Sequence, residues 1–405
     1  MTEYFFVAPA DVLMPRGNKG FGGTGQHGEA VPMPWPSVFA GALRSAILAR
    51  HPEALTDFVG GGRPAGAVGD ALGTSSEPGQ FRLSWCSLAT ASDTATATSM
   101  TPLPADLIAY SSSTLPADTH SMLLAALEPL APPPGLSTGS PLPLIPTLRS
   151  AHPGKAQAGR LLDGDALAAH LAGRLPAQSR TRDEMVRAEM RLGIALDPVR
   201  RSAAEGHLYT TEALRFAVKD QPFGFDGKFS PSDAGYLVGI DGADGLLGEA
   251  GLLRLGGDGR PAAYRRVDFR PPPPAVSAIA AAQRFRLMLT TPAVFEAGWM
   301  PPHVKVTGDD HVLDVPALEG GSLFRARLAC AALGRHEIVS GWNMATQRPK
   351  PAQRAVPTGS VYWFDRFEGD AERLAAWVAG GLWGDNPDTA RRAEGFNRAL
   401  LGQWA

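Results

Sequence analysis

The sequence predicts an α+β protein of two domains, and three observations favour this class. The chain has 405 residues, which is more than one hydrophobic core of ordinary size accommodates. A short apolar strand, a loop and a helix are predicted near the N-terminus, and the same order begins again near residue 284. Between them lies RPPPPAV, residues 270–276, a stiff polyproline stretch typical of a domain boundary. We therefore expect an N-terminal domain of residues 1–275 and a C-terminal domain of residues 276–405.

The N-terminal domain is expected to begin with a buried strand at residues 4–7, because YFFV is apolar and aromatic. A glycine-rich segment, RGNKGFGGTGQHG, follows at residues 16–28, and we call it the glycine loop. Ser37 is expected to cap the next helix, whose apolar side chains recur at helical spacing until Pro52. The glycine loop therefore lies between the first strand and the first helix.

Residues 60–153 are rich in Gly, Ala, Ser, Thr and Pro, and their hydrophobic periodicity is weak. This composition predicts a long, loop-rich insertion in the N-terminal domain, with one short strand at residues 84–89. A helix is expected at residues 165–175. His170 in that helix is interpreted as a residue of the helix surface or the edge of the core, and not as a ligand.

A long antiparallel hairpin is predicted in the middle of the chain, with strands at residues 191–196 and 207–216. The expected turn combines an acid, two arginines and turn-forming residues: Asp197, Pro198, Arg200, Arg201 and Gly206. The hairpin therefore has a basic tip. Taken singly, each arginine is interpreted as a solvated turn residue.

The C-terminal part of the sequence carries a local concentration of positive charge. Arg348, Lys350 and Arg354 lie in a loop before the strand predicted at residues 360–364, and no acid occurs between residues 343 and 364. Trp342 lies beside this loop and is the one tryptophan there that we expect to be able to stack on a base. A final amphipathic helix around residues 374–382 and a terminal strand are predicted to follow.

The composition limits the class of protein. The formal net charge is −2, so any site for a polyanion must be local. Cys86 and Cys330 are the only cysteines, which predicts neither a disulfide framework nor a paired metal site. The N-terminus has no signal-peptide pattern, and no apolar run is long enough to span a membrane. These features favour a protein of the reducing cytoplasm.

No catalytic constellation is visible in the sequence. His27 and His207 are the histidines nearest to the glycine loop and the hairpin, but no histidine or carboxylate pair has metal-ligand spacing. The glycine loop also lacks the Gly-Lys-Ser/Thr ending of a nucleotide-triphosphate loop, and Lys19 precedes most of its glycines. We therefore expect no enzyme activity, no metal and no cofactor.

Several of these blocks, taken in order, resemble a known family. They are the glycine loop before PSVFAGALRSAIL, the pair RLGIALD and LYTTEALRF, the pair SGWN and VPTGSVYWF, and the closing EGF before Leu401 and Trp404. Together they resemble the RAMP proteins of CRISPR effector complexes, and among them the third Cmr subunit of type III-B complexes. One departure is that Asn397 stands where the terminal loop of such proteins has a second glycine. Asparagine tolerates the left-handed backbone region better than most residues, so the shape of the loop is expected to survive.

The resemblance implies a fold and a role. Such proteins are built from ferredoxin-like domains, here two, with a projecting hairpin described as a thumb. The resemblance implies a non-catalytic subunit that binds the 5′ handle of the guide RNA at the base of the complex. Its implied partners are the large subunit that makes cyclic oligoadenylate and the first backbone subunit, with target cleavage belonging to the backbone.

The residues alone leave the glycine loop open to two interpretations, a flexible connector or a ligand-binding loop, and the resemblance favours contact with RNA or with a partner. Glycines permit close approach of backbone amides to phosphates, cations neutralise charge, and aromatic or amide side chains contact bases. The expected RNA-binding residues are Arg16, Asn18, Lys19, Phe21, Gly22, Gly23, Gln26, His27, Arg44, Arg200, Arg201, Trp342, Arg348, Lys350 and Arg354.

Two other functions remain open from the sequence. One is an endoribonuclease that processes repeat RNA on the same fold, with His27 or His207 as acid or base. The other is a scaffold subunit that contacts only protein partners.

Overall fold

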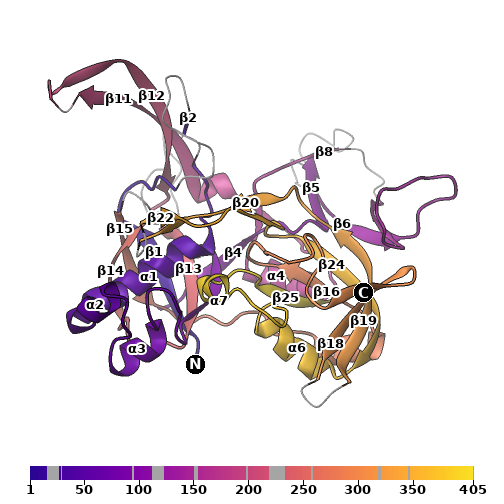
Figure 1. Ribbon diagram of the computed structural model, residues 1–405. Helices are drawn as coiled ribbons and strands as arrows, with labels where there is room; N and C mark the ends of the chain where they lie inside the picture. Colours follow the sequence, from indigo (N-terminus) through magenta and orange to yellow (C-terminus); the bar gives the residue numbers. More distant parts are fainter. Residues whose placement is uncertain are drawn as a thin grey trace. The chain divides into compact units, whose positions relative to one another are not determined.

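The computed structural model describes residues 1–15, 27–28, 30–93, 95–111, 123–149, 154–197, 199–218, 233–256, 259–317, 321–344 and 347–404 (Figure 1). The chain packs as two compact units. Unit 1 comprises residues 1–98, 182–269 and 339–352, and unit 2 comprises residues 99–181, 270–338 and 353–405. The units are interleaved in sequence, which differs from the expected division into residues 1–275 and 276–405. One of the crossings, between Phe269 and Arg270, falls at the polyproline stretch.

Unit 1 is built on an antiparallel sheet in which β1 lies between β13 and β15. The strands, in spatial order, are β3 (Arg82–Ala91), β13 (Asp233–Asp241), β1 (Glu3–Pro9), β15 (Arg260–Arg266) and β14 (Ala250–Leu255). The predicted first strand is therefore confirmed and is central to this sheet. The short strand expected at residues 84–89 is confirmed as the middle of β3, which is longer than predicted.

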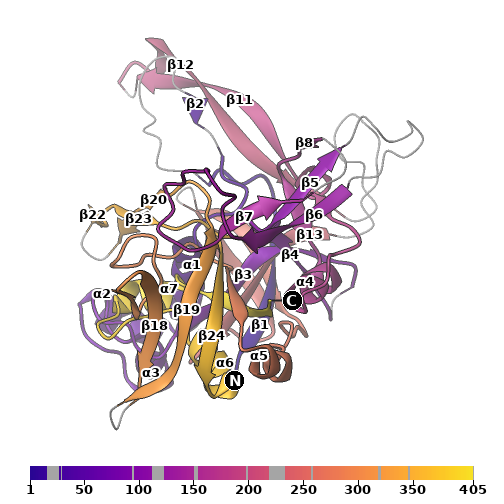
Figure 2. The same ribbon diagram turned by 90° about the vertical axis from the view of Figure 1, so that its right-hand side faces the viewer.

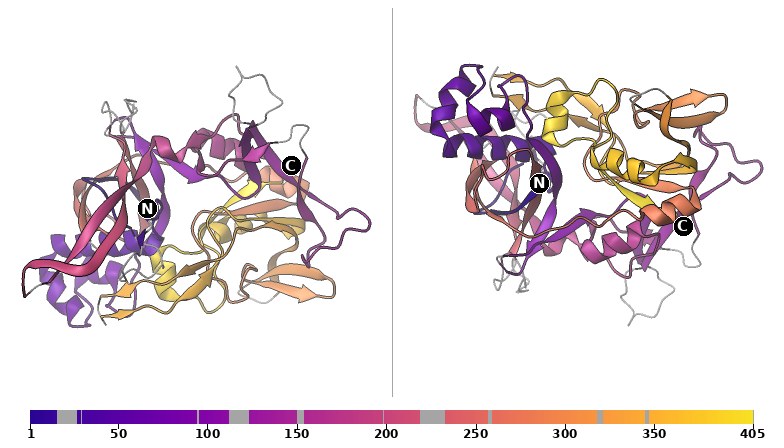
Figure 3. Two further views of the ribbon diagram at one scale, coloured as in Figure 1. Left: turned by 90° about the horizontal axis from the view of Figure 1, so that it is seen from above. Right: turned by 90° about the horizontal axis from the view of Figure 1, so that it is seen from below.

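Three helices follow β1: α1 (Pro36–Arg50), α2 (Pro52–Val59) and α3 (Gly66–Leu72). They lie together on one side of the sheet (Figure 3), where Phe39 of α1 packs edge-on against Tyr236 of β13 with ring centroids 4.9 Å apart. The predicted cap at Ser37 is wrong. The helix is preceded by Trp35 and has Pro36 in its first turn, and no side chain caps it. Proline supplies the helical φ angle there and has no N–H that would need a partner.

The predicted hairpin is confirmed as β11 (Val186–Asp197) paired antiparallel with β12 (Ser202–Phe216). It extends away from the rest of unit 1 (Figure 1). Gly206 lies within β12 and not in the turn, because the strand resumes at Ser202 directly after the tip. Unit 1 also contains the short strands β2 (His27–Gly28), β21 (Trp342–Asn343) and β22 (Arg348–Pro349), and the 3₁₀ turn at Arg182–Glu184.

Unit 2 is built on a six-stranded antiparallel sheet (Figure 2). Its strands, in spatial order, are β17 (Val304–Thr307), β18 (Asp310–Pro316), β19 (Ser322–Ala332), β24 (Val361–Gly369), β16 (Phe285–Leu289) and β25 (Ala399–Gln403). The predicted strands near residues 284 and 360 and at the C-terminus are thereby confirmed. The helices α5 (Val276–Ala282), α6 (Ala371–Ala379) and α7 (Thr389–Glu394) complete this part, with the short strands β20 (Glu337–Val339) and β23 (Gln353–Ala355).

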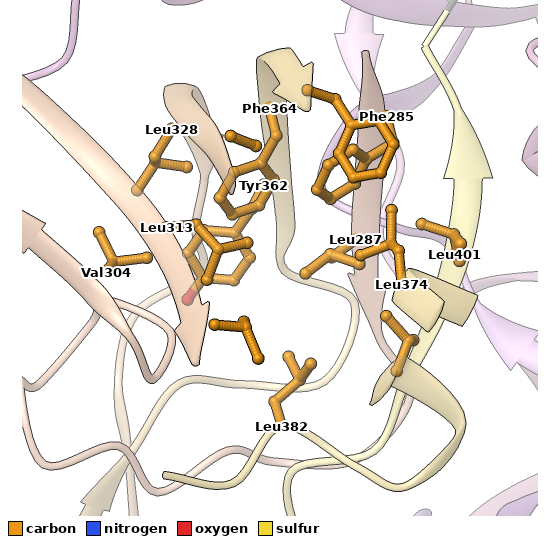
Figure 4. Close-up of a cluster of buried hydrophobic side chains, with 14 of the residues drawn as sticks. Phe285, Leu287, Val304, Leu313, Leu328, Tyr362, Phe364, Leu374, Leu382 and Leu401 are labelled. Carbon is orange, nitrogen blue, oxygen red and sulfur yellow. The ribbon is translucent and has the colours of Figure 1, made fainter. Parts of the chain in front are cut away.

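The core of unit 2 lies between its sheet and helices α5 and α6 (Figure 4). Phe285 and Leu287 of β16 point into this core, where Phe285 stacks on Phe364 at a centroid distance of 4.8 Å. Leu374 of α6 covers them, as the helical spacing predicted. All five residues of β16 are buried, because the opposite face of this strand is covered as well.

That opposite cover comes from residues 99–181, which also contain a small second sheet. The elements are β4 (Thr98–Pro102), β5 (Leu107–Ser111), β6 (Leu123–Leu130), β7 (Ile145–Leu148), β8 (Lys155–Ala156), β9 (Arg160–Leu162), α4 (Gly164–Leu171) and β10 (Arg180–Thr181). The predicted helix at residues 165–175 is confirmed as α4, which packs on β25. His170, expected at the helix surface or the core edge, is only 2% exposed and belongs to a buried ionic cluster.

The loop before β25 adopts the expected backbone. Gly395 ends α7 in the left-handed region, and Asn397 is also left-handed with φ of 59°. The Asn397 amide accepts a hydrogen bond from the Val294 N–H at 2.7 Å and donates to the Leu382 carbonyl at 2.9 Å. The prediction that asparagine preserves the loop is confirmed, and its buried side chain also ties three segments of unit 2 together.

Among the described residues, no helix combines the length and the apolar character needed to cross a membrane.

Candidate nucleic-acid interface

Both ends of the glycine loop are attached to β12 of the β11–β12 hairpin. Just before the loop, Leu13 exchanges two backbone hydrogen bonds with Leu214, near the base of the hairpin, at 2.9 and 2.7 Å. The loop ends in β2, which pairs in parallel with β12 and places His27 opposite Thr210, farther out along the strand. The Val31 N–H donates to the Pro15 carbonyl at 3.0 Å and so closes the loop. Two features that were predicted separately therefore form one structural feature of unit 1.

Most of the loop residues expected to bind RNA lie outside the described residues: Arg16, Asn18, Lys19, Phe21, Gly22, Gly23 and Gln26. His27 is described through its backbone in β2, and the side chains of His27 and His207 are outside the description. The described residues show how the two ends of the loop are attached to β12. A side-chain carboxylate strengthens this attachment, because Glu212 of β12 accepts a hydrogen bond from the Ala30 N–H at 2.9 Å.

The hairpin has two chemically different faces, because successive residues of a strand point to opposite sides. On one face, Val186, Leu214 and Phe216 are buried at the base. Farther out, the same face of β11 carries an exposed apolar row, with side chains 49–69% accessible: Met190, Leu192, Ile194 and Leu196. The core of unit 1 thus continues outward as an uncovered apolar surface, which we call the apolar row.

The other face of the hairpin carries charge and one aromatic ring. Glu189 lies 3.4 Å from Arg215 across the strands and 3.7 Å from Arg191 along its own strand. Farther out, Tyr209 packs over Gly193, where a Cβ atom would come within 2.4 Å of the ring. The glycine therefore allows the ring to lie flat across the strand pair. This face offers guanidinium groups and an aromatic surface, which are chemical features suited to RNA.

At the tip, the predicted arginines follow Asp197. The Asp197 carboxylate accepts hydrogen bonds from the N–H groups of Val199 and Arg200, at 2.8 and 3.0 Å. The Arg200 side chain is 82% exposed, and its Nε lies 4.0 Å from Asp197. Arg201 is also exposed and has a φ of 52°. Both cations are therefore presented at the end of the hairpin, as the sequence predicted.

Trp342, Arg348 and Lys350 come together in unit 1. Trp342 pairs with Pro349 in the short ladder of β21 and β22, which places Arg348 opposite Asn343. The Lys350 N–H donates to the Gly341 carbonyl at 2.8 Å and closes this ladder. The Trp342 side chain is 53% exposed, so an aromatic surface lies accessible beside a cationic strand.

The two other predicted residues have different surroundings. Arg354 belongs to unit 2, where it is exposed and lines a groove of about 1070 Å³ together with His303 and Lys305. Arg44 donates to the Leu72 carbonyl at 3.3 Å, and its guanidinium lies over the Phe58 ring, 5.7 Å from the centroid. Arg44 therefore connects α1 to α2 and α3, and its contact with RNA stays a prediction.

Sequence reasoning missed two features. The apolar row has a sequence signal, since apolar residues alternate along MRLGIAL, but the hairpin was interpreted only through its basic tip. The buried contact of His170 with Asp106 and Arg286 has no sequence signal, because these three residues are far apart in the sequence. Among the described residues, no group of three or more His, Cys, Asp or Glu side chains is arranged to hold a metal ion.

The family model that matches the chain describes a CRISPR-associated protein, which defines the class of this chain. The chain belongs to the Cas_Cmr3 family, whose model matches residues 5–404, and is thus a Cmr3-like subunit of a type III-B effector complex. No curated protein matches the chain.

Two solved structures resemble the fold. One is the type III-B Cmr-beta bound to cognate target RNA, at 13% identity and a TM-score of 0.49, covering 98% of this chain and 96% of that chain. The other is the same type of complex bound to cognate target RNA and AMPPnP, at 13% identity and a TM-score of 0.48 with the same coverage. The family assignment comes from the sequence match alone.

Proposed function

We propose that this chain is the non-catalytic subunit that binds the 5′ handle of the guide RNA and docks the large signalling subunit at the base of the complex. The observation that carries this proposal is the family match over nearly the whole chain, residues 5–404. The attachment of the glycine loop to β12 supports it, because a glycine-rich segment held by backbone hydrogen bonds at both ends is suited to phosphates.

We also propose that each unit contains a ferredoxin-like core. Such a core has four antiparallel strands in the spatial order 2-3-1-4, with helices in its two crossovers. In unit 1 the order β3-β13-β1-β15 has this pattern, with α1 in the first crossover. In unit 2 the order β19-β24-β16-β25 has it too, with α6 and α7 in the second crossover. Each unit has a β-hairpin in place of the other helix.

The charge of the chain favours a local RNA site. With a net charge of −2, nonspecific attraction to RNA is weak, so affinity depends on a few placed cations. Arg16 and Lys19 of the glycine loop and Arg348 and Lys350 beside Trp342 supply these in unit 1. Arg354 supplies one in unit 2.

Replacing Arg16 and Lys19 together by alanine is expected to weaken guide-RNA binding by the reconstituted complex without changing sequence preference. Phosphate contacts carry charge but no base information. Each lost contact reduces the slope of log affinity against log salt by roughly 0.7 for single-stranded RNA, so the double variant should reduce it by about 1.4. RNA affinity over a salt series measures both effects.

The matched control is the double variant Arg63→Ala, Arg174→Ala, which removes the same charge from exposed positions that are not assigned to RNA. It should leave the slope unchanged. If the glycine-loop variant assembles normally and keeps the wild-type slope, the loop serves protein contacts, as in the scaffold alternative. Metal-independent cutting of repeat RNA that is lost in His27→Ala would instead favour the endoribonuclease alternative.

The two faces of the hairpin suggest a division of roles in the complex. An isolated two-stranded ribbon is marginally stable in water, so the apolar row needs a cover in the assembled state. Because this row presents no cation, we assign it to an apolar surface of the first backbone subunit, and we assign the face with Arg191 and Tyr209 to RNA. The family match supports this assignment only in that it makes the chain a subunit of a type III-B effector complex.

Replacing Leu192 and Ile194 together by serine is expected to weaken association with the backbone subunit by about thirtyfold, because about 1 kcal/mol of apolar burial is lost at each position. Both side chains are exposed in the chain itself, so its stability should change little. Titration of the purified subunits by calorimetry measures the effect. Arg191→Ser on the opposite face is the control, and an equal loss in that variant would contradict the division of faces.

A further inference from the structure

Three ionisable side chains meet inside unit 2, and none of them is among the residues assigned to RNA. The Asp106 Oδ2 atom accepts a hydrogen bond from Arg286 Nη1 at 2.5 Å, and its Oδ1 atom lies 3.0 Å from His170 Nε2. Arg286 Nη2 donates to the His170 carbonyl and lies 3.4 Å from Nδ1 of the same histidine. We call these three side chains the ionic cluster.

The ionic cluster is almost fully buried: Asp106 is 1%, His170 2% and Arg286 8% exposed. Its members come from three segments that are distant in sequence. Asp106 immediately precedes β5, His170 lies in the last turn of α4, and Arg286 lies on the face of β16 opposite the core. The cluster therefore fastens the segment of residues 99–181 to the sheet of unit 2.

The hydrogen-bonding groups define the state of the histidine. A guanidinium has only donors, so Arg286 Nη2 requires a lone pair on His170 Nδ1. The proton of the neutral ring then lies on Nε2, facing the Asp106 carboxylate. That contact is electrostatic, since its geometry falls short of a directional hydrogen bond. A second proton on the ring would point at the guanidinium.

Among the described residues, no other charged group faces the ring. On β9, Arg160 is turned to Ser179 and Thr181, with donor–acceptor distances of 3.0 and 2.6 Å. On α4 itself, Asp163 caps the helix through the Ala166 N–H at 3.0 Å. The strand β25, with sequence ALLGQ, has no titratable side chain. Asp106 and Arg286 therefore determine the electrostatics of His170.

These surroundings lower the pKa of each of the three side chains. Burial is the main cause that lowers the pKa of His170 below its ordinary value of 6.5, with the Arg286 charge adding to it and Asp106 opposing it. Burial also lowers the pKa of Arg286, against the attraction of Asp106. For Asp106, burial opposes ionisation, but the contacts with His170 and Arg286 prevail and lower its pKa. The cluster is thus an ion pair beside a neutral histidine at neutral pH.

We propose that the ionic cluster is a proton-sensitive fastening, in which neutral His170 holds residues 103–111 and α4 against β16 and protonated His170 releases them. The direction of the pH dependence follows from the linkage between proton binding at His170 and opening of the segment. When the segment opens, His170 regains an ordinary pKa and binds a proton more readily than when it is enclosed. The fastening is therefore at full strength above pH 6.5 and weakens as the pH falls below that value.

Hydrogen exchange of the full-length chain tests this proposal. After correction for intrinsic rates, the opening constant of amides in residues 103–111 and 164–171 should rise between pH 7.5 and 5.5, and the ordinary pKa of 6.5 of the released ring limits this rise to about tenfold. Amides of α5 and α6, on the opposite face of the sheet, should show no such rise. An unchanged opening constant in the wild type would overturn the proposal.

Two variants separate His170 from other titrating groups. A glutamine side chain can present an oxygen to Arg286 and an N–H to Asp106 without taking up a proton, so His170→Gln should remove the pH dependence. His336→Gln changes an exposed histidine and should behave like the wild type. A rise that persists in His170→Gln would assign the effect to another group. If that variant does not fold, NMR titration of the wild-type imidazoles decides, because one ring must titrate below its ordinary pKa of 6.5.

Discussion

Replacing Asp106 by alanine is expected to lower the free energy of unfolding of unit 2 by about 3–5 kcal/mol, because it leaves Arg286 buried without its carboxylate partner. Arg286 has few alternatives, since its Nη2 already donates to the His170 carbonyl and its Nε has no hydrogen-bond partner among the described residues. Exchange of the β16 and β24 amides measures the loss in unit 2 itself. This readout does not require the whole chain to unfold in two states.

Two controls define the origin of that loss. Asp163→Ala removes a carboxylate that caps α4, and it should cost only about 1 kcal/mol. Combining Asp106→Ala with Arg286→Met removes the buried charge as well, and it should restore most of the lost stability. A cost below about 1 kcal/mol for Asp106→Ala alone would mean that the buried ion pair does not hold residues 99–181 in place.

Replacing Asn397 by alanine is expected to cost about 3 kcal/mol of stability in unit 2. The amide contacts the Val294 N–H and carbonyl and the Leu382 carbonyl, and alanine leaves these buried groups unsatisfied. Alanine also disfavours the φ of 59° at this position. Chemical unfolding followed by exchange of the β25 amides measures the effect.

Asn397→Gly is the matched variant, because glycine adopts the left-handed backbone without strain but cannot make the amide contacts. It should be more stable than Asn397→Ala by about 1 kcal/mol and still less stable than the wild type. Equal stability of the two variants would show that the backbone conformation contributes nothing. A glycine variant as stable as the wild type would show that the amide contacts contribute nothing.

Some strands of the structure have a local sequence signal. The apolar runs of β1, β16 and β24 and the strand-forming residues of β3 and of the β11–β12 hairpin were predicted, because the composition of a strand is a property of neighbouring residues. The strands β13, β14, β15, β17, β18 and β19 were not predicted. The left-handed backbone at Asn397 was predicted for a similarly local reason, the tolerance of asparagine for positive φ. These are properties of a few neighbouring residues, and a single sequence contains them.

The strands within residues 99–153 had no such signal. β5 and β7 are short, β6 and β7 each contain a proline, and the residues around them are rich in Pro, Ser and Thr, so the composition predicted loop. Their pairing joins residues such as Leu107 and Ala126, which only the folded chain brings together. The interleaving of the two units was missed for the same reason, since a change of unit needs no change in composition.

The candidate RNA interface was predicted in composition but not in arrangement. The glycine loop, the basic tip and the Trp342 region are visible as local patterns of glycine, charge and aromatic residues. The attachment of the loop to β12 depends on backbone hydrogen bonds such as that between Leu13 and Leu214, which side-chain identity does not encode.

The α+β class, the hairpin, the strands β1, β16, β24 and β25, and the family were predicted from the sequence. The folded chain brings distant residues together: the glycine loop with β12, and Asp106 with His170 and Arg286. The physical reason is that periodicity and turn chemistry act over a few residues, whereas burial of a charge depends on partners delivered from elsewhere in the chain. His170 looks like an ordinary helix residue in the sequence, and only the fold encloses it between a carboxylate and a guanidinium.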